Sequence, residues 1–251
     1  MKINGLAAVV TGGGSGLGEA TARMLAAQGA GVTVLDINGE AAEKVGHDIG
    51  GLGLGCDVSG AASAEEAMAV ANKAHGPCRI LVNCAGIAPA GRIVGRNGPM
   101  ALSDFERVVQ VNLIGSFNLL RLAAAEMSIA EPMEDGERGI IISTASIAAN
   151  EGQLGQAAYA ASKAGVIGMM LPAARELSRF GIRVMTIAPG LILTPLLAGM
   201  PQEVQDNLSQ QPLFPKRFGK SEEFAATVRH IVENPIINAD CIRLDGGMRM
   251  S

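Results

Sequence analysis

The sequence predicts an α/β fold, in which a doubly wound parallel sheet of about seven strands has helices on both faces. Three observations favour this fold. Short runs that are apolar almost without interruption recur along the chain, as expected for strands covered on both faces. Longer segments with helical spacing separate these runs, which implies right-handed strand–helix–strand crossovers. A glycine-rich turn follows directly after the first run.

The expected strands are residues 6–11, 31–36, 52–57, 79–83, 139–143, 182–188 and 240–244. The expected helices are residues 16–28, 40–48, 62–75, 103–127, 156–180 and 221–233. Ser103, Asp104 and Glu106 favour a capped start for the fourth helix. No linker, repeat or low-complexity tract divides the chain, so residues 1–251 are predicted to form a single domain.

Two stretches depart from this alternation. Residues 129–138 (IAEPMEDGER) form a charged loop where a short turn would connect a helix to a strand. Residues 190–219 are rich in proline and leucine and follow the end of a strand. They are expected to cover the carboxyl edge of the sheet as a substrate lid, because folds of this kind bind ligands at that edge.

The composition argues against several classes of function. A formal net charge of −4 provides no chain-wide basic field for a nucleic acid or an anionic membrane. Four cysteines without a C-x-x-C pair, and three histidines far apart in sequence, argue against a metal site. The chain starts MKINGLAAVV, without a charged and apolar leader, and has no uninterrupted apolar run of membrane length. We expect a cytoplasmic protein with reduced thiols.

The glycine-rich turn TGGGSGLG, residues 11–18, lies between the first expected strand and the first expected helix. Glycines allow the backbone to approach a pyrophosphate, whose charge then lies at the helix N-terminus. Such a turn alone is a weak signal and is by default structural. Its position, however, is the one that a dinucleotide site requires.

Asp36 ends the second expected strand, 18 residues beyond Gly18. A carboxylate at this point can accept two hydrogen bonds from an adenosine ribose and repel a 2′-phosphate. Neither Ser15 nor Ile37, where a phosphate-binding arginine or lysine would stand, is basic. The sequence therefore favours NAD over NADP as cofactor, and the alternative is an ordinary aspartate at a strand-end turn.

Tyr159 and Lys163 lie four residues apart, so a helix would place them on the same face. Tyr159 is the single tyrosine of the chain, and Ser146 precedes it by 13 residues, after the fifth expected strand. Removing a hydride from an alcohol carbon needs a general base at the alcohol oxygen. A nearby ammonium would favour the phenolate by lowering a pKa that is normally about 10. Ser146 would hold the same substrate oxygen.

Asn112 interrupts an otherwise apolar helical segment. A buried amide must find hydrogen-bonding partners. The sequence leaves two interpretations open. The side chain either serves the site, by bracing the backbone or by holding a water that relays protons to Lys163, or it is a structural asparagine that bends the helix.

Together TGGGSGLG, Asp36, NCAG at 83–86, Asn112, Ser146, YAASK at 159–163 and Pro189-Gly190 resemble the short-chain dehydrogenase/reductase family over essentially the full chain. The resemblance implies a Rossmann-type fold and a catalytic tetrad of Asn112, Ser146, Tyr159 and Lys163. The residues expected to contact NAD are Gly12, Ser15, Gly16, Leu17, Gly18, Asp36, Asp57, Val58, Cys84, Ala85, Gly86, Tyr159, Lys163, Pro189, Gly190 and Thr194. Those expected to contact the substrate are Ser146, Gln153, Gln156 and Tyr159.

Longer segments, including DFERVVQVNLIGSFNLLRLAAAEM and NEGQLGQAAYAASKAG, are similar to the 3-hydroxyacyl-CoA dehydrogenases of that family. This likeness implies NAD-linked interconversion of (S)-3-hydroxyacyl-CoA and 3-oxoacyl-CoA by a homotetramer in fatty-acid metabolism. The enzymatic alternatives are a 3-oxoacyl-carrier-protein reductase and a dehydrogenase of hydroxysteroids or other lipophilic secondary alcohols. A nucleotide-binding scaffold subunit is the non-enzymatic alternative.

Overall fold

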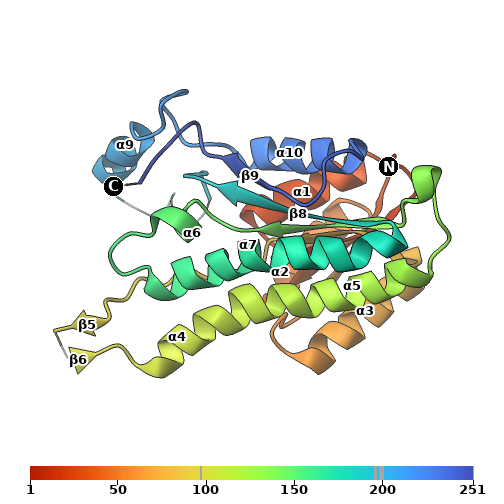
Figure 1. Ribbon diagram of the computed structural model, residues 1–251, viewed down its shortest axis with the longest axis horizontal. Coiled ribbons are helices and arrows are strands. Elements are labelled where there is room, and N and C mark those ends of the chain that lie inside the picture. Colours follow the sequence, from red (N-terminus) through yellow and green to blue (C-terminus); the bar gives the residue numbers. More distant parts are fainter. Residues whose placement is uncertain (97, 195–196, 198–200, 251) are drawn as a thin grey trace.

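The computed structural model describes residues 1–96, 98–194, 197 and 201–250 (Figure 1). Its centre is a seven-stranded parallel sheet in the order β3-β2-β1-β4-β7-β8-β9. The strands are β1 (Ala7–Thr11), β2 (Gly31–Asp36), β3 (Leu52–Gly55), β4 (Cys78–Asn83), β7 (Gly139–Thr144), β8 (Ile182–Pro189) and β9 (Cys241–Leu244). All seven predicted strands are confirmed, with ends that differ by at most two residues. The strand order reverses between β1 and β4, the point at which doubly wound sheets bind ligands.

Helices cover both faces of the sheet (Figure 1). Against one face pack α1 (Gly16–Ala27), α2 (Gly39–Asp48) and α10 (Ser221–Glu233). Against the other pack α3 (Ala61–His75), α5 (Gly115–Ile129) and α7 (Ala157–Leu177). In β7, Ile141 packs on the face covered by α3, α5 and α7, whereas Ile140 and Ile142 pack on the face covered by α1, α2 and α10. Burial on both faces explains why the strands are apolar almost without interruption.

The long fourth helix of the prediction is divided in the structure. It comprises α4 (Leu102–Val109), a π-helical turn at Gln110–Ile114, and α5. Its N-cap is Ala101, which makes no side-chain capping bond, so the expected cap by Ser103 was wrong.

The run Leu102–Ile129 is long and apolar enough to cross a membrane by length and composition alone. Half of its most apolar window is buried inside the protein, so core packing accounts for this character.

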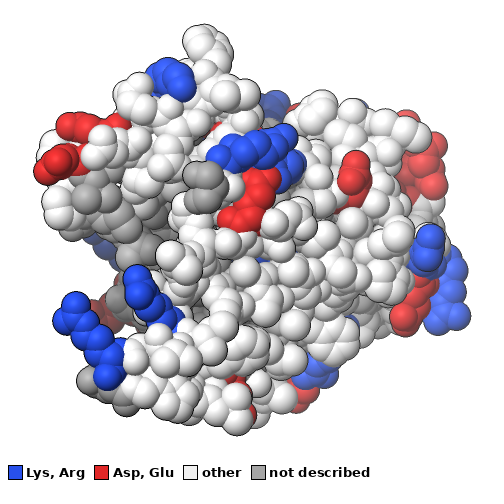
Figure 2. Space-filling model, turned by 60° about the vertical axis from the view of Figure 1, so that its left-hand side comes forward, with Lys and Arg blue, Asp and Glu red and all other residues white. Residues whose placement is uncertain are grey.

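Several short elements that the sequence did not predict lie near the carboxyl ends of the strands. They are β5 (Val94–Gly95), β6 (Gly98–Pro99), α6 (Ala148–Glu151) and α9 (Gln202–Ser209), all at the left of Figure 1. Figure 2 shows this end hollowed, with Lys or Arg side chains below the hollow and Asp or Glu side chains above it. Within the predicted lid, Ile192 forms a β-bridge with Gly219. Residues 195–196 and 198–200 of the predicted lid lie outside the described residues.

The charged loop at residues 129–138 supplies a partner for a buried arginine. Glu137 Oε1 accepts a hydrogen bond from Arg183 Nε at 2.7 Å, and both side chains are buried. The Arg183 guanidinium also donates to the carbonyl oxygens of Ile231 and Val232 in the last turn of α10. These carbonyls have no partner within the helix, because the last turn of any helix leaves them free. The loop therefore joins β8 to the end of α10.

Candidate active site

The glycine-rich turn packs directly against the end of β4. Gly12 has φ +61°, and a Cβ on it would lie 2.7 Å from the backbone nitrogen of Ala85. A Cβ on Gly18 would overlap the carbonyl oxygen of Gly12. Thr11 Oγ1 accepts hydrogen bonds from the N–H groups of Cys84 and Ala85, both at 3.1 Å. Glycine is therefore required where the two segments meet.

The start of α1 is open toward solvent. Ser15 is the N-cap residue, and its side chain is exposed and makes no capping bond. Gly16 and Leu17 follow in the first turn, whose N–H groups carry the partial positive charge of a helix N-terminus. This exposed, glycine-lined terminus fits the pyrophosphate of a dinucleotide.

Asp36 lies beside the turn, as predicted. Its Oδ2 accepts a hydrogen bond from the N–H of Gly14 at 3.0 Å, and its Oδ1 accepts one from the N–H of Asn38 at 3.0 Å. A carboxylate has about four acceptor sites, so two sites remain for ribose hydroxyls. The carboxylate thus closes the strand-end turn and is also placed to receive a ribose.

Asp57 and Val58 follow β3 on the same side of the sheet. Asp57 is exposed, and its Oδ1 accepts hydrogen bonds from the N–H and hydroxyl groups of Ser59. Val58 is buried, and its carbonyl oxygen accepts a hydrogen bond from Asn118 Nδ2 at 2.8 Å. Hydrogen bonds with Ser59 and Asn118 therefore hold this loop in place.

Ser146, Tyr159 and Lys163 come together as the sequence predicts. Tyr159 and Lys163 lie in α7, and Lys163 Nζ is 5.8 Å from the centroid of the Tyr159 ring. Lys163 is buried, and its ammonium donates a hydrogen bond to the carbonyl oxygen of Thr144 at 2.7 Å. Ser146 follows β7 and hydrogen-bonds to the Tyr159 phenol. A hydroxyl and a phenol therefore converge at one point, with a lysine behind them.

The pKa of Tyr159 differs from the prediction. Burial raises it above its usual value of 10.0, and the hydrogen bond from Ser146 acts in the opposite direction. Burial also lowers the pKa of Lys163, to about 8. The direction is opposite to the lowering expected from the lysine charge, because burial, which disfavours the charged phenolate, is the largest effect on Tyr159 in the protein alone.

Replacing Ser146 with alanine is expected to raise the pKa of Tyr159 further, because the serine hydrogen bond favours the phenolate. The chain contains one tyrosine and no tryptophan, so near-ultraviolet absorbance during a pH titration reports on Tyr159 alone. Ser128→Ala, which removes an exposed hydroxyl from α5, is the control and should leave the midpoint in place. A midpoint that falls or stays constant in Ser146→Ala would contradict the assignment.

Asn112 lies within the π-helical turn and is completely buried. Its Oδ1 accepts from the N–H of Ile87 at 2.8 Å, and its Nδ2 donates to the carbonyl oxygen of Ile87 at 2.9 Å and to Ser162 Oγ at 3.0 Å. Both amide protons are thus used within the protein. Of the interpretations that the sequence left open, this geometry favours the bracing of the backbone.

Asn112 also explains the small residue at Gly86. A Cβ on Gly86 would lie 3.2 Å from Asn112 Oδ1 and 3.4 Å from Lys163 Nζ.

Cys84, at the end of β4, accepts a hydrogen bond from Thr144 Oγ1 at 3.5 Å. Burial raises the pKa of the Cys84 thiol to about 11, so the thiol stays protonated and is not a nucleophile.

Gln153 and Gln156, which the sequence predicts to contact the substrate, lie at the start of α7. Gln156 is the N-cap residue of α7, and its Oε1 accepts a hydrogen bond from the N–H of Gln153 at 2.9 Å. Both glutamines line a groove of about 460 Å³. The other residues that line this groove are Gly91, Arg92, Ile93, Val94, Gly152, Leu154, Gly155, Ala157 and Ala160.

Pro189 is the last residue of β8 and Gly190 follows it; the carbonyl oxygen of Pro189 accepts a hydrogen bond from the N–H of Ile147 at 3.1 Å. Thr194 lies two residues beyond the bridge at Ile192.

The sequence did not point to Ser162 or to the Thr144 carbonyl as partners of the site. Neither has a motif of its own, since one is a small helical residue and the other acts through its backbone.

Comparisons with known proteins agree with this geometry. A family model described as "short chain dehydrogenase" matches residues 6–205. The 3-hydroxyacyl-CoA dehydrogenase type-2 of Homo sapiens is 49% identical over 255 residues, which cover 99% of this chain and 97% of that protein. The protein of the same name from Rattus norvegicus is 47% identical over 253 residues, with the same coverage.

Among solved structures, the crystal structure of 3-hydroxyacyl-CoA dehydrogenase type-2 from Mycobacterium avium matches with a TM-score of 0.94 and 42% identity. The match covers 98% of this chain and 97% of that chain. The residues matched by the family model include the glycine-rich turn, Asn112, Ser146, Tyr159 and Lys163.

Proposed function

Because the chain belongs to the short-chain dehydrogenase family, we propose that it interconverts (S)-3-hydroxyacyl-CoA and 3-oxoacyl-CoA as an NAD-dependent oxidoreductase. The family membership expected from the sequence is confirmed by the full-length relatives. The observation that carries the proposal is the convergence of Ser146 and Tyr159, with Lys163 behind them, beside a glycine-lined helix terminus.

The chain's own groups account for the proton transfer. Tyr159 takes the proton from the substrate hydroxyl in oxidation and returns it in reduction. Ser146 donates a hydrogen bond to the same oxygen and stabilises the charge that develops on it. Lys163, fixed by the Thr144 carbonyl, keeps a positive charge beside the phenol. The nicotinamide cofactor, when bound, accepts or supplies the hydride.

The residues of the turn fit a dinucleotide, and Asp36 supports NAD over NADP. The 2′-phosphate of NADP would bring negative charge beside the Asp36 carboxylate, and the neighbouring Ile37 is exposed and uncharged. Repulsion of this kind costs several kcal/mol, so a preference for NADH of about 100-fold or more in kcat/KM is expected.

The double variant Asp36→Ala with Ile37→Arg is expected to reverse much of the cofactor preference, because it replaces the carboxylate with a guanidinium that binds phosphate. The measurement is kcat/KM with NADH and with NADPH for the variant and the parent. Glu43→Ala, which removes an exposed carboxylate from α2, is the matched control and should keep the parent preference. Equal use of NADPH by the parent protein would refute the cofactor assignment.

The acyl-CoA substrate is supported by the relatives and by the groove beside α7. Human and rat relatives that match the whole chain are named as 3-hydroxyacyl-CoA dehydrogenases. In the groove, Ile93, Val94 and Leu154 are exposed apolar side chains that suit an acyl chain, and Arg92 is the charged residue of its lining. A hydroxysteroid or another lipophilic alcohol would suit the apolar side chains equally well.

The test is a panel of short and long 3-hydroxyacyl-CoAs of both configurations, hydroxysteroids and simple secondary alcohols, each with NAD and NADP. Oxidation of the (S)-3-hydroxyacyl-CoAs with the highest kcat/KM is expected. Faster reduction of 3-oxoacyl groups on a carrier protein would favour the reductase alternative. Binding of NADH without turnover of any member of the panel would favour the scaffold alternative.

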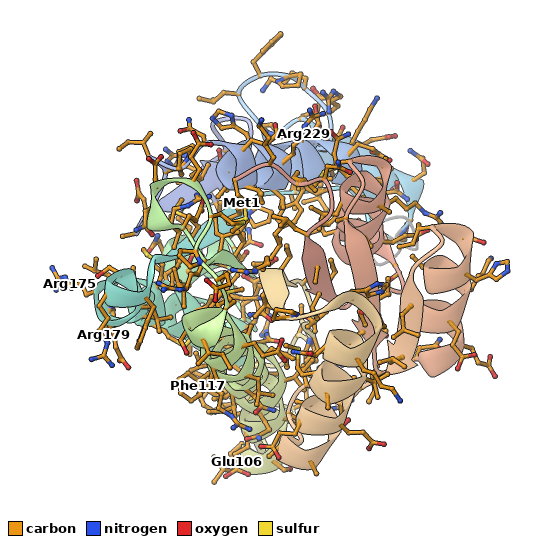
Figure 3. All side chains as sticks on the ribbon, turned by 90° about the vertical axis from the view of Figure 1, so that its right-hand side faces the viewer. Met1, Glu106, Phe117, Arg175, Arg179 and Arg229 are labelled. Atoms are coloured by element: carbon orange, nitrogen blue, oxygen red, sulfur yellow. The ribbon has the colours of Figure 1, made fainter. Side chains whose placement is uncertain are left out.

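A homotetramer is supported by apolar side chains on the helices that face away from the sheet. Ile114, Phe117 and Leu171 are 42%, 48% and 39% exposed, respectively. Figure 3 places Phe117 on the outward side of its helix. Exposed apolar residues on adjacent helices are typical of an interface between subunits.

Sedimentation of the purified protein is expected to show a species of four 25.7 kDa chains. Phe117→Asp should shift this species toward smaller assemblies, because it places a charge within the apolar contact. Phe214→Asp, at a highly exposed residue far from α5 in the chain, is the control. A parent protein that sediments only at 25.7 kDa would contradict the tetramer.

The single-domain organisation and the cytoplasmic location stay predictions. All four cysteines are free thiols, which is typical of a reducing compartment. Cell fractionation would test the location, and cooperative unfolding in one transition would test the domain organisation.

A further inference from the structure

Arg243, Glu151 and Asp245 form a cluster, here the Arg243 cluster, near the C-terminus. Arg243 in β9 donates from Nη1 to Glu151 Oε1 at 2.9 Å and from Nε to Asp245 Oδ2 at 2.8 Å. Its Nη2 donates to the carbonyl oxygen of Met248 at 3.0 Å. The acidic side chains keep only 17% and 7% of their accessible surface, so solvent screens these pairs less than pairs on an open surface.

Glu151 connects this cluster to Ser146. It is the last residue of α6, a helix of four residues that begins two positions after Ser146. So short a helix is not stable on its own. At its beginning, Ser146 Oγ accepts a hydrogen bond from the N–H of Ala148 at 3.1 Å. At its end, Glu151 accepts hydrogen bonds from Arg243 and from the N–H of Met250, at 2.9 Å each, and Arg249 Nε lies 3.7 Å from its Oε1.

The turn that follows β9 also contacts two other segments around the site. The carbonyl oxygen of Gly246 accepts hydrogen bonds from the N–H groups of Leu213 at 2.9 Å and Phe214 at 3.2 Å. A Cβ on Gly190 would lie 2.7 Å from Asp245 Cβ. The C-terminal turn therefore joins α6, the end of β8 and the last part of the 190–219 segment.

We infer that Arg243 is a positioning residue for Ser146, acting through Glu151. It contacts the far end of α6 and none of the groups assigned to the reaction. Without the guanidinium, Glu151 keeps the Met250 N–H but loses the shorter of its two ion pairs. The end of α6 is then held less firmly, and Ser146 is less well aligned with the Tyr159 phenol. The inference rests on the proposed function in one respect only, which is that Ser146 binds the substrate oxygen.

The first test titrates Tyr159 by near-ultraviolet absorbance in Arg243→Gln, Arg243→Lys and Glu151→Gln. The titratable groups around the phenol are Lys163 on the same helix and, beside Lys163, Cys84. None of the hydrogen bonds of Arg243 reaches either group. A rise of the Tyr159 midpoint is expected, because Ser146 no longer favours the phenolate. Arg229→Gln, which breaks the exposed pair with Glu233, is the matched control.

The second test compares kinetics for acetoacetyl-CoA reduction with NADH binding. Arg243→Gln and Glu151→Gln should each lower kcat by about tenfold, because small misplacements of a catalytic group have effects of this size or larger. The double variant should be no slower than the slower single variant, because both act through one contact. NADH affinity should stay constant, since the glycine-rich turn is untouched.

The outcomes separate the two proposals. If the Tyr159 midpoint rises in the Arg243 and Glu151 variants but the parent protein does not reduce acetoacetyl-CoA, the proposed substrate is refuted and the positioning role is kept. A midpoint and kcat equal to those of Arg229→Gln, in any folded variant of the cluster, would overturn the positioning role. Arg243→Lys and Glu151→Gln keep the test decisive if Arg243→Gln does not fold.

Discussion

Tyr159→Phe is expected to lower kcat by about 10³-fold or more, because it removes the proton donor and acceptor at the substrate oxygen. NADH affinity should change little, since the turn at residues 11–18 and Asp36 are unaffected. Steady-state kinetics and fluorescence titration with NADH measure the two quantities separately. Tyr159 is half-buried, and phenylalanine keeps its ring in place, so the loss of activity would not come from a loss of folding.

Two results of this experiment would contradict the prediction for different reasons. If Tyr159→Phe retained more than a tenth of the parent kcat, another group would have to transfer the proton. If it lost NADH binding as well, the loss of activity would reflect a damaged cofactor site.

Lys163→Met is expected to abolish most activity without lowering the thermal stability of the protein. Burial lowers the pKa of Lys163 to about 8, which means that the folded protein disfavours its charge. Methionine fills similar space without that charge. The loss of the hydrogen bond to the Thr144 carbonyl costs about 1–3 kcal/mol, which the removal of a buried charge offsets. The melting temperature of the variant should equal or exceed that of the parent at pH 7.

The pH dependence of this stability has a defined sign. The pKa of Lys163 is about 8 in the folded protein and 10.5 when unperturbed. Between these values the unfolded chain binds more protons, so the stability of the parent rises with pH. The stability advantage of Lys163→Met should therefore shrink from pH 7 to pH 10. Lys73→Met, at an exposed position on α3, is the control and should show no such trend. A variant that is far less stable at pH 7 would contradict this account.

The sheet was predictable because its strands are buried on both faces. Residues such as Ile140, Ile141 and Ile142 show this directly, since each is apolar whichever face it occupies. The strands β5 and β6 have two residues each, which is too few for any periodicity to be visible. The π-helical turn was hidden for a different reason. Its sequence QVNLI continues the apolar spacing of an α-helix, and only the hydrogen-bond pattern distinguishes it.

The site was predictable in its residue types but not in its energetics. A single tyrosine four residues before a lysine was enough to place both groups on one side of α7. The raised pKa of Tyr159 depends on how tightly the surrounding chain excludes water, which no local pattern records. The partners of Asn112 could not be predicted from the sequence either, because two of its three hydrogen bonds go to the backbone of Ile87.

The π-helical turn holds one residue more than a regular α-helical turn would. A single deletion within residues 110–114 would allow α4 and α5 to join in one regular α-helix, which is the locally favoured state. Because the extra residue is taken up within one turn, the two helices would keep nearly the same faces toward the sheet. Leu119 and Met127 would stay buried, whereas the hydrogen bonds of Asn112 to Ile87 and Ser162 would be displaced. A deletion scan should therefore find that losing one residue from this turn preserves the fold and impairs the site.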